Sequence, residues 1–79
     1  MFLWISGFLK GDDDDDSLKY DHTVQPEHEA AVLEILGWSS LEESPEGEWL
    51  LTSNQVQHIA VLINESLPTE LDLFIGVRA

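Results

Sequence analysis

The sequence predicts a small α+β domain in which a three- to four-stranded sheet has two helices packed on one face. Three observations predict this fold. Alternating apolar residues indicate strands near both ends of the chain, two inner segments have apolar residues at helical spacing, and 79 residues allow only one core. The hydrophobic content of 43% and the three tryptophans are typical of a folded chain. We therefore expect residues 1–79 to form a single domain with the element order β-β-α-(loop)-α-β.

The chain is expected to open with a β-hairpin. Residues 2–9, FLWISGFL, are apolar on both faces of a strand, and such a strand is usually central in its sheet or covered on both faces. Residues 18–24, LKYDHTV, alternate apolar and polar side chains, which indicates a half-buried second strand. Residues 11–17 lie between them and are expected to form an acidic hairpin loop, because Asp and Gly favour turns over strands.

The first helix is the clearest element of the sequence, in the segment QPEHEAAVLEILG. Pro26 suits the first helical position, Gly37 suits the position just beyond the last turn, and the apolar residues between them form one stripe. Residues 38–52 are expected to be a connecting loop. Within this loop we expect a turn at residues 44–47 and a short extended piece at residues 49–51.

The second helix is expected to begin at Thr52, because Thr52 and Gln55 have the spacing of a capping box. Apolar residues at helical spacing continue as far as Leu67, and Pro68 is expected to end the helix. Residues 70–77, ELDLFIGV, alternate again and indicate a final strand.

The charge of the chain excludes several classes of partner. Sixteen acidic residues against three lysines and arginines give a net charge of −13. Such a chain repels the phosphates of nucleic acids and the headgroups of anionic membranes, so we expect neither as a partner. A basic protein would instead be attracted and steered towards it. The alternative interpretation is that the acidity only keeps a small protein in solution.

The apolar start of the chain does not have the pattern of a targeting segment. MFLWISGFLK has no basic region before its apolar run, and the run is too short to span a bilayer. There is no cysteine, which excludes a disulfide framework and a thiolate metal site. These features fit a cytoplasmic protein.

The aspartate run invites a comparison with calcium-binding loops, which it does not match. An EF-hand loop places its oxygen ligands at alternating positions, with a central glycine and a glutamate at position twelve. Residues 12–16 are consecutive aspartates without these features, and the three histidines are assigned to three separate elements. We therefore expect no specific metal site and no cofactor. The open interpretations of the run are a solvated loop tip, loosely associated with divalent cations, and a contact surface for a basic partner.

No group of residues indicates catalysis. The chain has no cysteine, no serine in a nucleophile-elbow context, and no carboxylate whose surroundings distinguish it as a general acid. We therefore expect a protein that is not an enzyme.

The candidate partner-binding residues are acids and one aromatic residue. Trp38 and Trp49 bracket the acidic segment SSLEESPEGE, and aromatic residues near charged rims are typical of interface hot spots, although they also fill small cores. Trp49 is expected to be the more exposed of the two, because it follows a turn. The full set comprises Asp12, Asp13, Asp14, Asp15, Asp16, Asp21, Glu42, Glu43, Glu46, Glu48 and Trp49. The two acidic loops together are a candidate for one continuous negative face.

The segments FLWISGFLKG and SLKYDHTV, followed later by WLLTSNQVQHIAVLI, resemble the N-terminal hairpin and the strand-to-helix step of small acidic immunity proteins. These belong to bacterial toxin–immunity pairs, including those of contact-dependent growth inhibition. The resemblance covers size, charge and layout over the whole chain. It implies a 1:1 complex with a basic toxin, often a nuclease, whose active-site groove is covered by an acidic surface. The alternative is a non-catalytic adaptor or structural interaction domain in a bacterial assembly.

Overall fold

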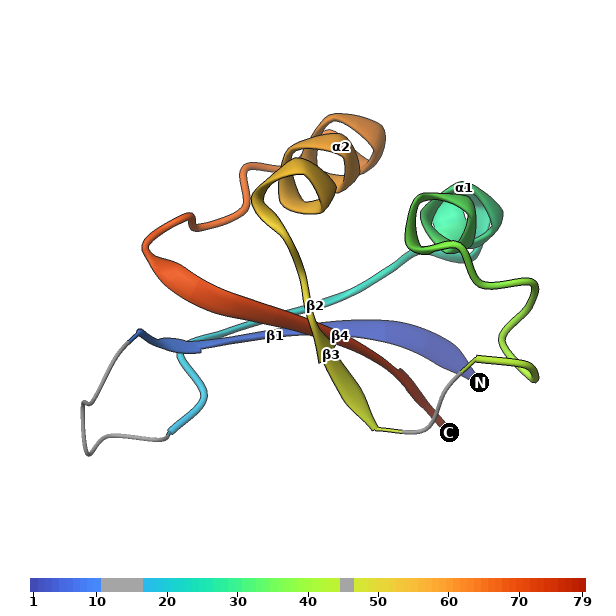
Figure 1. Cartoon of the computed structure of the whole chain (residues 1–79), viewed down its shortest axis with the longest axis horizontal. Helices are drawn as coiled ribbons and strands as arrows, with labels where there is room; N and C mark the ends of the chain where they lie inside the picture. The colour runs from blue at the N-terminus through green and yellow to red at the C-terminus, as the bar shows by residue number, and fades with distance from the viewer. Residues whose placement is uncertain (11–16, 45–46) are drawn as a thin grey trace.

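A four-stranded antiparallel sheet carries two helices on one face (Figure 1). This computed structural model describes residues 1–10, 17–44 and 47–79. The elements follow each other as β1 (Phe2–Leu9), β2 (Tyr20–Thr23), α1 (Pro26–Leu36), β3 (Glu48–Leu50), α2 (Ser53–Ile63) and β4 (Leu71–Arg78). The expected α+β class is confirmed, and so is the placement of both helices on one face. The fourth strand, β3, lies inside the expected connecting loop 38–52, where the sequence indicates a short extended piece.

The sheet order is β2-β1-β4-β3, so the first and last strands of the chain form its centre. β1 and β4 pair over their whole length, from Phe2 opposite Arg78 to Leu9 opposite Leu71. The central position expected for β1 is therefore confirmed. β2 and β3 are short edge strands, and short edges limit unwanted pairing with other chains.

The core lies between the central strands and the helices. Directly paired residues of neighbouring strands point to the same face of a sheet, so Ile5 and Ile75 lie side by side. Both are fully buried, as are Val32 of α1 and Ile59 of α2. Each fully buried aliphatic side chain of this size contributes about 1.5–3 kcal/mol relative to an exposed one. Val32 and Ile59 belong to the helix stripes expected from the sequence, and at these positions the stripes reach the core.

The ends of α1 agree with the sequence. Pro26 is the first residue of the helix, and Gly37 follows its last turn in the left-handed conformation with φ 77°. The Gly37 N–H donates to carbonyl oxygens of the last turn. Glycine adopts this conformation without the steric cost that a Cβ atom brings.

The predicted end of α2 is wrong. The helix begins as expected with the capping box of Thr52 and Gln55, but it ends at Ile63 and not at Pro68. Asn64 takes the left-handed conformation with φ 55°, which stops the helix. Leu67 is buried as expected, yet it lies in the following loop and not on the helix.

The second strand is shorter than its alternating pattern indicates. β2 spans Tyr20–Thr23 within the expected residues 18–24. Single backbone hydrogen bonds, from the Lys19 N–H to the Gly7 oxygen and from the Val24 N–H to the Leu3 oxygen, continue its contact with β1 on either side. Residues 11–16, most of the expected hairpin loop 11–17, lie outside the described residues.

The sheet has one face covered by helices and one that we call the open face. Figure 1 shows α1 and α2 on the same side of the sheet. β1 is apolar on both faces, and the two helices cover one of them. From the strand register, the open face comprises Phe2, Trp4, Ser6, Phe8, Asp21, Thr23, Glu48, Leu50, Asp72, Phe74, Gly76 and Arg78.

Candidate binding surfaces

The structure distributes the described acidic candidates over separate parts of the molecule. Asp21 lies on β2 and Glu48 on β3, the two opposite edges of the sheet. Three strand spacings separate these edges, which is about 14 Å. Glu42 and Glu43 lie exposed in the turn that follows α1. Asp12, Asp13, Asp14, Asp15, Asp16 and Glu46 lie outside the described residues.

The described residues next to the two acidic segments lie towards opposite ends of β4. Leu9, just before the aspartate segment, pairs with Leu71 at the start of β4. Glu48, just after the second acidic segment, pairs with Gly76 near the end of β4. Five residues of a strand span about 17 Å. The described residues flanking the two loops therefore do not bring them together, and they give no support to one continuous negative face.

Glu48 is paired with one of the few basic residues of the chain. Its Oε1 lies 2.5 Å from Nη2 of Arg78, and the Arg78 guanidinium lies 4.5 Å from the centre of the Trp4 ring. The ion pair is exposed, so it contributes at most about 1 kcal/mol. It nevertheless holds Arg78 over Trp4 on the open face. Sequence reasoning missed this contact, because its partners are 30 residues apart from each other in the chain.

Trp49 is exposed, as the sequence indicates. Its side chain is 48% exposed and lies on the helix side of β3, opposite Ile75 of β4. It borders a shallow groove of about 310 Å³ between β3 and the helices. Trp38 lines the same groove but is partly buried and packs against the core. The two tryptophans therefore have different roles, since Trp38 fills core volume and Trp49 faces solvent.

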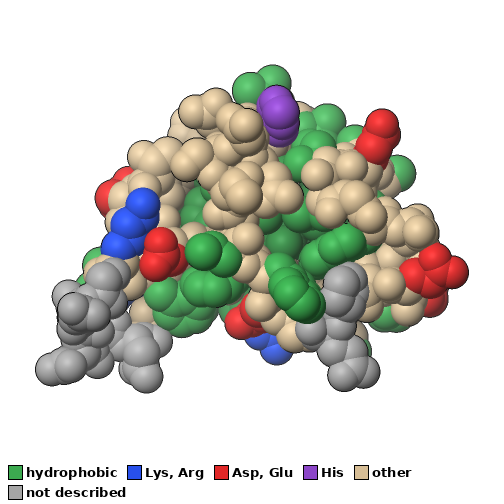
Figure 2. Space-filling view, in the orientation of Figure 1, with side chains coloured by type: hydrophobic (Ala, Val, Ile, Leu, Met, Phe, Trp, Pro, Cys, Tyr) green, Lys and Arg blue, Asp and Glu red, His purple; other side chains and the backbone are tan. Residues whose placement is uncertain are grey.

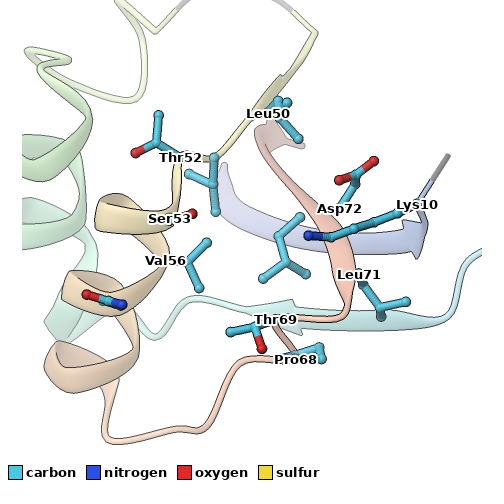
Figure 3. Close-up of a pocket in the computed structure, with 12 residues that line it drawn as sticks. Lys10, Leu50, Thr52, Ser53, Val56, Pro68, Thr69, Leu71 and Asp72 are labelled. Atoms are coloured by element: carbon cyan, nitrogen blue, oxygen red, sulfur yellow. The ribbon is translucent and has the colours of Figure 1, made fainter.

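A second cavity of about 470 Å³ lies between the first turn of α2 and the start of β4 (Figure 3). Its wall is aliphatic towards the core, through Leu51, Val56 and Leu73, and Lys10 and Asp72 bring opposite charges to it. Thr52, Ser53, Gln57 and Thr69 add polar groups to the lining, so the cavity is not mainly apolar. The described lining residues include no histidine.

Hydrophobic side chains reach the molecular surface between the helix layer and the sheet. Figure 2 shows them across the middle of the molecule, with acidic side chains scattered around them. Leu50 on β3 is 59% exposed, and Val61 on the outer side of α2 is 82% exposed. Scattered exposed apolar residues are ordinary, whereas a patch next to charged groups indicates an interface.

Tyr20 is the one described side chain whose pKa is clearly shifted. Burial raises the pKa of its phenol, and the negative charges of Glu65 and Asp21 raise it further. Tyr20 lies on the helix side of β2 and packs against the core. No three histidine, aspartate or glutamate side chains in the described parts of the chain gather as a metal site requires.

No family model, no curated protein and no solved structure matches this chain. Neither α1 nor α2, the helices within the described residues, has the length and apolar character needed to cross a membrane.

Proposed function

We propose that the chain is a non-catalytic binding protein that neutralises a basic protein, in the manner of an immunity protein acting on a nuclease toxin. The proposal places a 1:1 complex in the cytoplasm, with acids covering the groove that the partner uses for phosphates. The observation that carries it is an exposed tryptophan on an edge strand of a strongly acidic domain. The acids supply attraction and the tryptophan supplies apolar contact.

The charge supports a basic partner over other classes. Asp21, Glu42 and Glu43 are exposed, and the whole chain carries a net charge of −13. A nuclease groove concentrates Lys and Arg, so carboxylates can take the positions of phosphates there. In the barnase–barstar complex, close charge pairs have coupling energies of about 1.5–7 kcal/mol. Electrostatic steering of this kind raises association rates by roughly 10–10³.

Trp49 supplies what charge alone does not. Tryptophan is enriched at interface hot spots, because it buries a large rigid surface on binding. Trp49 stands beside a groove in which a partner's apolar side chain has room. Acids that lie around such an anchor act mainly on the association rate and on specificity, and the anchor acts on the lifetime of the complex.

A second candidate, the adaptor or structural interaction domain, is favoured by the exposed edge of β3. The Leu51 N–H donates to the Leu73 oxygen, and hydrogen-bonded pairs alternate along an antiparallel ladder. The backbone groups of Glu48 and Leu50 therefore point away from β4, towards the edge. An extended segment of a partner can add to such an edge by backbone hydrogen bonds. Binding of this kind depends little on salt, which separates the two candidates.

The experiment for the proposal is capture from an extract of the source cell on the immobilised chain, with elution by a salt gradient and identification by mass spectrometry. We expect a basic protein that is released only at high salt and whose nuclease activity is suppressed by one equivalent of the chain. Trp49→Ser is expected to weaken the isolated complex by about tenfold or more. Val61→Ser is the matched control on the outer side of α2. Recovery of no basic protein, or of one that stays active when bound, contradicts the proposal.

A further inference from the structure

The open face of the sheet carries aromatic residues at its centre. Phe2, Trp4 and Phe8 of β1 and Phe74 of β4 are partly exposed there. The rings of Phe8 and Phe74 meet edge to face, with centroids 5.9 Å apart. Within the described chain both helices lie on the other side of the sheet, so no helix covers these rings, and the Arg78 guanidinium lies over Trp4. Aromatic groups of this kind contribute most of the binding energy in many interfaces.

The aromatic centre is already packed before any partner binds. Ser6 points to the same face between Trp4 and Phe8 along β1, yet it is fully buried. Its hydroxyl has no hydrogen-bond partner among the described residues. The neighbouring side chains therefore cover Ser6 completely. A surface that is ordered in advance loses little conformational entropy on binding.

Acidic residues surround this centre. Asp21 lies on the β2 side, Asp72 near the start of β4, and Glu48 on the β3 side. The open face has these three acids against one base, Arg78, which is bound to Glu48. Lys10 lines the adjoining cavity together with Asp72. An apolar centre within a charged rim is the layout of protein interfaces. Here the sign of the rim is negative.

A cavity adjoins the open face at its β3 edge. Leu50 and Asp72 belong to the open face and also line the cavity of about 470 Å³ at the start of β4. Leu50 is 59% exposed at this border. A partner side chain that enters the cavity from the open face would contact the aliphatic wall beyond it. Hot-spot residues typically fill such pockets.

We propose that the open face is the docking surface for a cationic amphipathic segment of the partner. Lysine or arginine side chains of that segment reach the carboxylates of Asp21 and Asp72, and its apolar side chains cover the aromatic centre. The inference rests on the proposed function and gives the same partner a second surface, since Trp49 and its groove lie on the other side of β3.

The charge of the open face argues against the other occupants. A second copy of the chain brings an equal net charge of −13 and sets an acidic rim against an acidic rim. Single-stranded nucleic acid stacks on aromatic residues of open sheets, but it requires basic groups for its phosphates. Here the phosphates would meet carboxylates. A cationic segment is the occupant whose charge complements the rim.

The proposal is tested by titrating the isotope-labelled chain with a synthetic peptide of alternating lysine and leucine, followed by amide NMR shifts. A lysine–serine peptide keeps the positive charge and removes the apolar groups. A glutamate–leucine peptide keeps the apolar groups and inverts the charge. We expect the largest shifts on β1 and β4 and at the Trp4 indole. Affinity for the lysine–leucine peptide should exceed that for either control by about tenfold or more.

Two substitutions locate the surface. Leu50→Thr removes an exposed side chain with little effect on folding, and Trp4→Thr removes the central ring. Both are expected to lower the affinity for the lysine–leucine peptide by about tenfold. Val61→Thr replaces an exposed apolar residue far from the open face and is expected to leave this affinity unchanged. Thermal melts of all three variants show whether the fold is retained.

Several results overturn the docking surface. They are shifts confined to α1 and α2, unchanged affinity in Leu50→Thr, no binding of the lysine–leucine peptide, self-association of the chain through β1 and β4, or binding of oligothymidylate on the open face. Failure of this surface is distinguishable from failure of the proposed function. A captured basic partner that binds Leu50→Thr and Trp4→Thr as tightly as the wild type retains the function and removes this surface. If the open face binds the peptide but no basic partner is captured, the docking surface is retained and the proposed function is removed.

Discussion

Gly76 shows at the scale of one residue how closely β3 approaches the centre of the sheet. A Cβ atom at this position would lie 2.7 Å from the Gly47 carbonyl oxygen and 3.2 Å from Cγ of Glu48. The first contact is to backbone, so it is relieved only by moving β3. Glycine at position 76 is therefore required by this close approach.

We predict that Gly76→Ala lowers the free energy of unfolding by about 1–3 kcal/mol, the usual cost of overpacking. Chemical denaturation measures the loss, and faster amide exchange in β3 shows its location. Gly37→Ala is the comparison, since its Cβ meets nothing within 4 Å and its cost of about 1 kcal/mol comes from the left-handed backbone alone. Unchanged amide exchange in β3 of Gly76→Ala would contradict the close approach of the Gly47 backbone to position 76.

Tyr20 gives a residue-scale prediction for alkaline pH. Burial, with the charges of Glu65 and Asp21, raises the pKa of its phenol above the value of about 10 in an unfolded chain. The folded state therefore keeps its proton when the unfolded state has lost it. The contribution of Tyr20 to the free energy of unfolding is fully present below a pH of about 10, and it is lost as the pH rises through the folded pKa.

The chain contains a single tyrosine, so ultraviolet absorbance of the phenolate reports this group alone. We expect a titration midpoint above that of the unfolded chain in denaturant. In Tyr20→Phe the free energy of unfolding should lose this alkaline dependence. A midpoint equal to the unfolded value would mean that Tyr20 is solvated and remote from both carboxylates.

At the scale of the element, the capping box fixes where α2 begins. The Thr52 hydroxyl accepts from the Gln55 N–H at 3.2 Å, and the Thr52 N–H donates to Oε1 of Gln55 at 2.9 Å. We predict that Thr52→Ala lowers the free energy of unfolding by about 1 kcal/mol. Ser53→Ala, at the next position, is the matched control. Equal losses in the two variants would show that the cap does not stabilise the helix.

Element boundaries were predictable where a residue type determines the backbone. Pro26 and Gly37 restrict the backbone strongly, and α1 has the predicted ends. Asn64 ends α2 earlier than expected, because asparagine tolerates the left-handed conformation without requiring it. The apolar positions up to Leu67 indicate burial correctly, but burial continues in the loop beyond the helix.

The candidate surfaces were less predictable than the elements. The exposure of Trp49 follows from its place after a turn, and the sequence indicates it. A strand that is apolar on both faces does not reveal which face the helices cover, so the open face with Trp4 and Phe74 emerges only from the strand register. The pairing of Arg78 with Glu48 depends equally on the register of β3 against β4.

At the scale of the whole molecule, the excess of negative charge acts on stability as well as on binding. Like charges repel more in the compact state than in the unfolded chain. Replacement of Asp12, Asp13, Asp14, Asp15 and Asp16 by Asn removes five of the sixteen acids. We predict an equal or higher melting temperature at low salt and a smaller stabilisation by added salt. A loss of more than about 1 kcal/mol would instead indicate that these aspartates make stabilising contacts.

In the proposed complex, acids attract the basic partner while an apolar surface holds it. The salt dependence of the association and dissociation rates of the captured partner tests this division directly. We predict an association rate that falls steeply as salt rises, because screening shortens the reach of the charges, and a dissociation rate that changes little. The same association rate at low and high salt would contradict the account, and the acidity would then serve only to keep the chain in solution.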